Sequence, residues 1–286
     1  MQAVLAELIE LLALERIEKN LFRGPSQDLG WGRVFGGQVL GQALSAAGQT
    51  VPEDRAVHSV HAYFLRSGDA TQPIVYTVDP IRDGRSFTTR RVVAVQNGEA
   101  ILNMAASFQI DEPGLDHQDA APEVRPPEDL LSETALAERF ADRIPESLHA
   151  IAFAERPIEI RPVRPIDPLS PKVLPARRQV WMRSVDALPD DPTLHRYLLA
   201  YASDFHLLTT AMQPHGVSWL TPGFQIASLD HGMWFHRPFR MDDWLLYDID
   251  GPTASGARGL VRGRFFDRQG NHVASTVQEG LIRDRR

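Results

Sequence analysis

One carboxylate in this chain of 286 residues lies in a setting that could give it chemistry. Asp204 falls in the segment 198–208, whose apolar residues recur at helical spacing, so we expect it on or beside a buried helix face. A buried carboxylate must find partners or shift its pKa upward, and a raised pKa makes it a usable general base. The alternative is an aspartate that caps the helix or faces solvent.

Two other polar side chains interrupt predicted strands. Ser228 lies in a strand expected over 224–236, and Gln278 lies between Val277 and Glu279 in the last strand. Each has a structural alternative, because a sheet serine can bond to a neighbour and a glutamine can form a cross-strand polar pair. Since the three residues come from different elements, the sequence alone does not show that they converge.

The histidines give no metal-binding pattern. His231 and His236 are five apart in a predicted strand, so their side chains point to opposite faces and a shared metal site is disfavoured. His58 and His61 are an odd number of steps apart, so we expect them on opposite faces, with one in the core. Six arginines could bind ligand phosphates in bidentate fashion, or could simply be exposed strand residues. They are Arg85, Arg90, Arg91, Arg258, Arg262 and Arg264.

Several common catalytic motifs are absent. The run Gly216–Leu220 fails the G-x-S-x-G pattern at its last position, which weakens a serine-hydrolase interpretation. The glycines at 30, 32, 36 and 37 miss the spacing of a dinucleotide-binding loop, and no Walker A sequence is present. The chain has no cysteine, which excludes disulfides, a cysteine nucleophile and thiolate metal sites.

The elements that must position these residues follow the same order twice. In the first half we expect helix 3–13, strand 14–23, helix 38–47 and strands 56–66, 73–82, 86–96 and 99–110. A linker rich in Pro, Asp and Glu, with a short helix near 128–142, precedes strands 156–163 and 177–184, helix 191–212 and strands 224–236, 243–250, 257–267 and 271–283. Tight turns such as Asn97-Gly98 make the sheets antiparallel.

Residues also repeat between the halves. His61, Tyr63–Arg66 and the turn at Gly98 recur as His231, Trp234–Arg237 and the turn at Gly270, with an offset of 171 or 172 for the last two. Self-similarity at half the chain length indicates a duplicated domain. The prediction is an α+β double hot-dog, two fused units that each wrap an antiparallel sheet around a central helix, with limits 1–115, 116–155 (linker) and 156–286. The copies differ where apolar Ala106 corresponds to polar Gln278, which suggests a single surviving site.

Charge and hydropathy limit the partners. With 37 acidic and 30 basic residues the net charge is −7, so a nucleic-acid partner is disfavoured and a small molecule or protein is favoured. No apolar run approaches the roughly 18 residues that span a bilayer. Glu7, Glu10, Glu15 and Glu18 interrupt the N-terminal leucines, so we expect no signal peptide and a cytoplasmic location.

Five segments together resemble the acyl-CoA thioesterase II (TesB) family, over about residues 5–283. They are Val34–Val39, Tyr63–Arg66, Ser228–Phe239, Arg258–Gly263 and Ala274–Gly280. The resemblance implies a double hot-dog enzyme that hydrolyses acyl-CoA to free acid and CoA, with no metal or organic cofactor. It also implies that an Asp, a Thr or Ser, and a Gln hold the attacking water, which in this chain are Asp204, Ser228 and Gln278. The middle residue is serine here, which keeps the hydroxyl and loses a methyl group.

These residues predict direct attack by water, with Asp204 as general base and the acyl chain in an apolar tunnel between helix and sheet. By analogy with other hot-dog proteins we expect a homo-oligomer, a dimer or tetramer. Two alternatives keep the fold. A hot-dog enoyl-CoA hydratase would place a histidine five residues after the aspartate, where this chain has Thr209. A non-catalytic acyl-CoA-binding or regulatory module should lack one of the three polar residues, and all are present.

Overall fold

Two helices and six strands make up the first half of the protein, in a computed structural model that describes residues 1–286. They are α1 (Ala3–Leu12), β1 (Glu15–Glu18), β2 (Leu21–Gly24), α2 (Gly36–Gly48), β3 (Arg55–Phe64), β4 (Ile74–Asp83), β5 (Phe87–Gln96) and β6 (Glu99–Ile110). The predicted strand 14–23 is wrong in one respect. It is a hairpin, β1–β2, that turns at Asn20, whose φ of 63° is the left-handed conformation that asparagine tolerates.

The connecting segment has little regular structure. It contains α3 (Glu133–Arg139), α4 (His149–Ala152) and the 3₁₀ turns Pro127–Asp129, Ala141–Arg143 and Glu146–Leu148. The expected helix near 128–142 is therefore shorter than predicted. Its N-cap is Ser132, whose hydroxyl accepts a hydrogen bond from the Ala135 N–H. The domain limits at 115/116 and 155/156 stay a prediction.

The second half contains two helices and seven strands. They are β7 (Ile158–Pro162), β8 (Arg177–Ser184), α5 (Pro192–Ser203), α6 (Leu207–Met212), β9 (Phe224–Ser228), β10 (Asp230–Phe235), β11 (Leu245–Ser255), β12 (Arg258–Phe266) and β13 (His272–Asp284), with a 3₁₀ turn over Gln213–His215. Two predictions are corrected here. The single helix expected over 191–212 breaks after Ser203, and the single strand expected over 224–236 is interrupted at Leu229. Both interruptions lie at predicted site residues.

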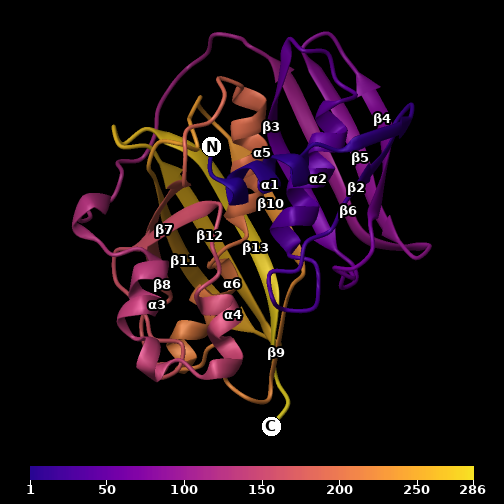
Figure 1. Ribbon diagram of the computed structural model, residues 1–286. Helices are drawn as coiled ribbons and strands as arrows, with labels where there is room; N and C mark the ends of the chain where they lie inside the picture. The colour runs from indigo at the N-terminus through magenta and orange to yellow at the C-terminus, as the bar shows by residue number, and fades with distance from the viewer.

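The strands of both halves join into one antiparallel sheet of 13 strands. Its order is β1-β2-β4-β5-β6-β3-β10-β13-β12-β11-β8-β7, with β9 paired to β13. The halves meet where β3 pairs with β10, which places His231 opposite Ala62 and covers one edge of each half. Figure 1 shows the purple strands of the first half and the yellow strands of the second half on the two sides of the molecule. The double hot-dog prediction is confirmed.

The central helices lie between the two parts of the sheet (Figure 1). α2 packs on β3, β4, β5 and β6 and against α5, whereas α6 packs on β11, β12 and β13. The helices α2 and α5 approach closely because α2 has glycine at the contact, where a Cβ on Gly37 would overlap the carbonyl oxygen of Tyr201. None of the helices is long and apolar enough to cross a membrane. The break between α5 and α6 therefore lies where the two halves and their helices meet.

Candidate active site

Asp204 is the residue at which α5 ends. The hydroxyl of Tyr247 donates a hydrogen bond to the carbonyl of Ser203 at 2.9 Å. A side chain from β11 therefore satisfies a carbonyl that has no backbone partner at the end of the helix. Two residues later, His206 adopts a left-handed conformation with φ of 67°, and the chain turns into α6. The carboxylate of Asp204 is thereby placed beside the start of α2, where Gly36 and Gly37 lie.

The structure brings the three predicted polar residues together. The hydroxyl of Ser228 lies 3.3 Å from Oδ1 of Asp204, and Nε2 of Gln278 donates to the Ser228 oxygen at 2.9 Å. Gln278 is fully buried, whereas Asp204 and Ser228 are half-buried. A carboxylate that is partly accessible to solvent, with a hydroxyl and an amide aligned beside it, can hold and deprotonate a water molecule.

Ser228 reaches this position because the strand that carries it changes course. Ser228 ends β9, which pairs with β13 so that Ser228 lies opposite Gly280. Asp230 then begins β10 and accepts a hydrogen bond from the backbone N–H of Glu279 through Oδ1 at 2.6 Å. The Asp230 side chain thus takes the place of a backbone acceptor for β13, at the residue after Gln278. At this irregularity in the strand pairing, the Ser228 hydroxyl points to Asp204.

Burial raises the pKa of Asp204 above the 3.8 of an ordinary aspartate. His231, when its ring is charged, and hydrogen bonds from Gln278, Ser228 and the Gly37 N–H lower the pKa of Asp204, but they do not cancel the rise that burial causes. The burial has an aromatic component, because the rings of Phe35 and Phe205 stack at a centroid distance of 4.6 Å next to this turn. The raised pKa is the direction that suits a general base.

A fourth polar residue, His231, extends the chain of hydrogen bonds, and the sequence did not identify it. Its Nδ1 lies 2.6 Å from Oε1 of Gln278, and its Nε2 lies 3.0 Å from the hydroxyl of Ser203. Burial lowers the pKa of His231, which favours the neutral ring. Ser203 and His231 resemble a serine–histidine pair, but Ser203 is 0% exposed, so no substrate carbonyl can reach it as a nucleophile.

The repeat contained a signal for His231, but the similarity of the motifs aligned His231 with His61, one residue away from its true counterpart. In the first half, Val60 on β3 lies directly opposite Ala106 on β6, and both are buried. In the second half the same positions hold His231 and Gln278, so His231 corresponds to Val60 rather than to exposed His61. Correct alignment of the repeat would have shown two polar substitutions facing each other instead of one.

Comparison with known proteins places this arrangement in a family. The family model described as acyl-CoA thioesterase matches residues 147–281, and the model described as acyl-CoA thioesterase N-terminal domain matches residues 25–109. The chain is 45% identical over 283 residues to acyl-CoA thioesterase 2 of Haemophilus influenzae, covering 99% of both chains. The chain belongs to the acyl-CoA thioesterase family.

Solved structures agree with the family and the fold. The crystal structure of an acyl-CoA thioesterase II, TesB2, from Mycobacterium marinum is 43% identical, has a TM-score of 0.78 and matches 97% of this chain and 98% of that one. A protein of unknown function with a hot-dog fold from Alicyclobacillus acidocaldarius is 20% identical with a TM-score of 0.76, and covers 97% and 98% of the two chains. The latter likeness supports the fold alone.

The histidines of β3 form no hydrogen bond with the candidate catalytic residues of this acyl-CoA thioesterase. A β-bulge between Val57 and Ser59 shifts the alternation, so the prediction that His58 and His61 face opposite sides with one in the core is wrong. His58 is half-buried and its Nε2 lies 2.8 Å from the hydroxyl of Ser107, while His61 is exposed. The prediction for His231 and His236 is confirmed, since the first is buried and the second exposed.

The six candidate arginines are mostly paired on the protein surface. Arg90 is the exception in burial, at 3% exposed, and its guanidinium donates to Asp83 at 2.7 Å. The other ion pairs are Arg91–Asp79, Arg258–Glu279, Arg262–Asp250 and Arg264–Asp248. Arg85 is exposed and forms no ion pair. Five of the six arginines already neutralise carboxylates, as expected for the structural alternative, and their binding to CoA phosphates stays a prediction.

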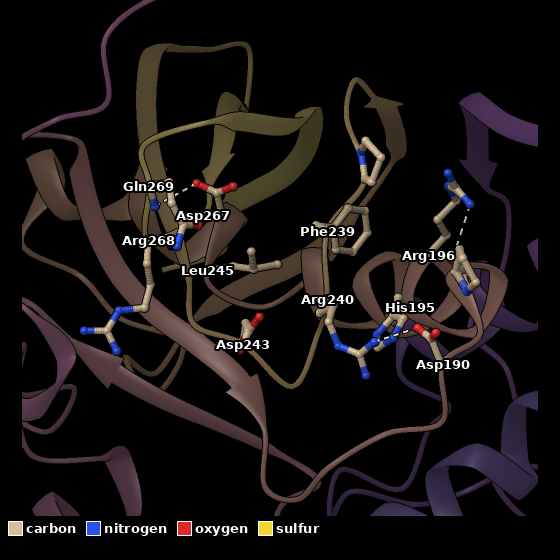
Figure 2. Close-up of a pocket in the computed structure, with 12 residues that line it drawn as sticks. Asp190, His195, Arg196, Phe239, Arg240, Asp243, Leu245, Asp267, Arg268 and Gln269 are labelled. Atoms are coloured by element: carbon tan, nitrogen blue, oxygen red, sulfur yellow. Dashed lines mark hydrogen bonds and ion pairs between the residues drawn. The ribbon is translucent and has the colours of Figure 1, made fainter. Parts of the chain in front are cut away.

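A surface pocket of about 410 Å³ opens at the other end of α5. Figure 2 shows Arg240 paired with Asp190 beside His195, with Arg268 on the far side of the opening. His195 precedes Asp204 by nine residues, about 13 Å along a helix. None of the three candidate catalytic residues lines this pocket. No group of three or more His, Asp or Glu side chains is arranged to hold a metal ion.

Proposed function

We propose that the protein hydrolyses fatty acyl-CoA to a free fatty acid and CoA, with Asp204 as the general base. The observation that carries the proposal is the half-buried carboxylate of raised pKa with Ser228 and Gln278 aligned on it. Family membership supports the reaction class, since the curated relative from Haemophilus influenzae is named an acyl-CoA thioesterase.

In the proposed reaction, a water molecule beside Asp204 attacks the thioester carbonyl carbon while Asp204 takes its proton. The tetrahedral intermediate collapses, the carbon–sulfur bond breaks, and the CoA thiolate leaves and takes the proton that Asp204 removed from water, which returns Asp204 to its ionised form. Such base catalysis is typically worth about 10²- to 10⁴-fold. Ser228 and Gln278 contribute positioning, because their hydrogen bonds fix the carboxylate and the water relative to the carbonyl. The N-terminal end of α2, beside Asp204, favours the negative charge that develops.

A serine nucleophile is the mechanistic rival, because Asp204 could instead deprotonate Ser228. The amide of Gln278 donates to the Ser228 oxygen, which lowers its nucleophilicity. Direct attack therefore predicts that Ser228→Ala weakens turnover through lost positioning but does not abolish it. Complete loss in that variant, with rescue by Ser228→Thr, would favour an acyl-enzyme.

Two alternatives from the sequence have less support. A hydratase of this fold would need a second acid–base group where Thr209 lies, and the Thr209 hydroxyl donates to the backbone carbonyl of His206 at 2.9 Å. A non-catalytic binding module would have no need for a pKa-shifted carboxylate with two aligned partners. The acyl tunnel, the cytoplasmic location and the assembly into a dimer or tetramer stay predictions.

The proposal is tested by following free-thiol release from acyl-CoAs of short to long chain. The wild type, Asp204→Asn and a control, Asp190→Asn, are compared. Asp190 precedes α5 at its opposite end and is almost fully exposed, so its charge should not matter for turnover. We expect Asp204→Asn to lower turnover by about 10²- to 10⁴-fold and the control to match the wild type. No thiol release by the wild type at any chain length, despite acyl-CoA binding, would favour the binding module.

A further inference from the structure

His231 lies behind Gln278, out of reach of any substrate, yet it makes the shortest side-chain contact in the network. Its Nδ1 is 2.6 Å from Oε1 of Gln278, and both residues are buried, at 1% and 0% exposed. Its Nε2 is 3.0 Å from the hydroxyl of Ser203, the residue before Asp204. The side chains Asp204, Ser228, Gln278, His231 and Ser203 therefore form one continuous chain of hydrogen bonds that returns to its starting point through the backbone.

The donor and acceptor roles along this series of hydrogen bonds follow from the protons that each side chain carries. The carboxylate of Asp204 can only accept, so the single hydroxyl proton of Ser228 goes to Oδ1. The Ser228 oxygen must then accept from Gln278, which places the amide nitrogen towards Ser228 and the amide oxygen towards His231. An amide oxygen only accepts, so Nδ1 of His231 carries a proton.

The other side of His231 supports the same assignment. With the proton on Nδ1, the neutral ring accepts at Nε2, and Ser203 has a hydroxyl proton to give it at 3.0 Å. The same hydroxyl also lies 2.9 Å from the Ala200 carbonyl. If the ring becomes charged, Nε2 is a donor as well, and the Ser203 hydroxyl donates its hydrogen bond to this carbonyl instead. In both states of the ring Nδ1 remains a donor, so Gln278 keeps one orientation.

We propose that His231 is a positioning residue that holds the Gln278 amide with its nitrogen towards Ser228 and the reacting water. This inference rests on the proposed function of Asp204, Ser228 and Gln278. Without a donor at position 231, the amide is free to turn by half a rotation. Its oxygen would then compete for the Ser228 proton, which would leave Asp204 without that hydrogen bond and present an acceptor where a donor is needed.

The first half of the protein shows that the fold does not require this pair. Val60 and Ala106 occupy the same places on β3 and β6, and the sheet and core form around them. The sheet therefore does not need a histidine and a glutamine at these places in the second half, which favours a role for them in the site. The first half also supplies the substitutions for a test, since His231→Val and Gln278→Ala give the second half the pair that the first half already has.

The experiment is a double-mutant cycle on kcat and KM for acyl-CoA hydrolysis, with His231→Val and Gln278→Ala singly and together. We expect His231→Val to lower kcat by about 10- to 100-fold with little change in KM, because it acts on positioning alone. In the Gln278→Ala background the same change should cost less than about twofold, since the amide it orients is gone. His231→Asn, which keeps an N–H near the place of Nδ1, should recover part of the loss.

The outcomes separate the inference from the proposed function. Wild-type kcat in Gln278→Ala would refute the positioning role of Gln278 and with it that of His231, whereas the proposed function fails only if the wild type releases no thiol or Asp204→Asn keeps wild-type turnover. A large loss in Gln278→Ala with wild-type kcat in His231→Val, or with equal losses from His231→Val in both backgrounds, would overturn only the role of His231. If thermal unfolding shows that His231→Val is not folded, His231→Leu replaces it, because leucine fills more of the buried space of the ring and likewise offers Gln278 no donor. A loss in kcat of several fold that disappears in the Gln278→Ala background is expected there, and an unchanged kcat overturns the inference.

Discussion

A methyl group at position 36 is expected to disable the site while leaving the fold in place. Gly36 is the first residue of α2, and a Cβ added there would lie 2.6 Å from Oδ2 of Asp204 and 3.1 Å from Cε1 of Phe64. Real Cβ atoms do not approach closer than 3.0 Å, so the carboxylate must withdraw by about 0.4 Å, the difference between 3.0 and 2.6 Å. Oδ2 is the oxygen that Ser228 leaves free.

The effect on catalysis follows from that displacement. A general base must lie within about 2.6–3.2 Å of the atom it deprotonates, and a misplacement of about 1 Å can cost 10²-fold. The methyl group also removes water from Oδ2. We therefore expect Gly36→Ala to lower kcat/KM by about 10- to 100-fold. Its effect on stability should stay within the roughly 1–3 kcal/mol of overpacking, partly offset by the better helix propensity of alanine.

The assay is thiol release from acyl-CoA, with thermal unfolding measured in parallel. Gly41→Ala in the same helix is the matched control. Its added Cβ would lie 2.9 Å from the flexible Leu12 Cδ2 and 3.3 Å from the Tyr197 carbonyl, and it touches no member of the network. A Gly36→Ala variant that folds and keeps wild-type kcat/KM would show that Oδ2 of Asp204 does not face the reacting water.

Three further predictions concern the same carboxylate and the turn that holds it. Because burial raises the pKa of Asp204, kcat/KM should fall as the pH drops through a value above 3.8, and Ser228→Ala should move that fall to higher pH, as a pH–rate profile would show. A carboxyl with a raised folded-state pKa binds its proton more tightly in the native state, so its ionisation costs stability as the pH rises. Asp204→Asn should therefore melt at a higher temperature than the wild type at pH 7, and a difference that persists well below pH 3.8 would contradict this. Tyr247→Phe leaves the Ser203 carbonyl without its partner, and denaturant unfolding should show a loss of about 1–3 kcal/mol together with reduced kcat.

The overall architecture was accessible from the sequence because it depends on local patterns. Strands with alternating apolar residues, tight turns and a helix ahead of the last four strands occur in both halves, and each copy specifies the same unit. The breaks at Ser203 and Leu229 were not accessible, since both depend on distant partners. Tyr247 lies 44 residues from the carbonyl it binds, and the side chain of Asp230 bonds to a backbone N–H 49 residues away.

The site was partly accessible for related reasons. Asp204 and Gln278 were recognisable as polar residues in apolar surroundings, but their convergence depends on the helix break, which helical periodicity conceals. The error at His58 and His61 came from a bulge, because a single extra residue reverses the alternation on which the prediction rested. The sequence pattern placed His231 as a possible metal ligand and as the repeat of His61, whereas its partner is an amide across the strand pair.

The proposed mechanism depends on direct attack of the thioester by a water molecule that Asp204 holds. It is tested most directly by a single turnover with enzyme in excess over acyl-CoA, in water labelled with heavy oxygen, with rapid quenching and mass spectrometry of product and protein. Direct attack predicts that CoA and free acid appear together and that the label enters the acid and not the protein. Label in the Asp204 carboxylate, or CoA released ahead of the acid from an acylated Ser228, would contradict it.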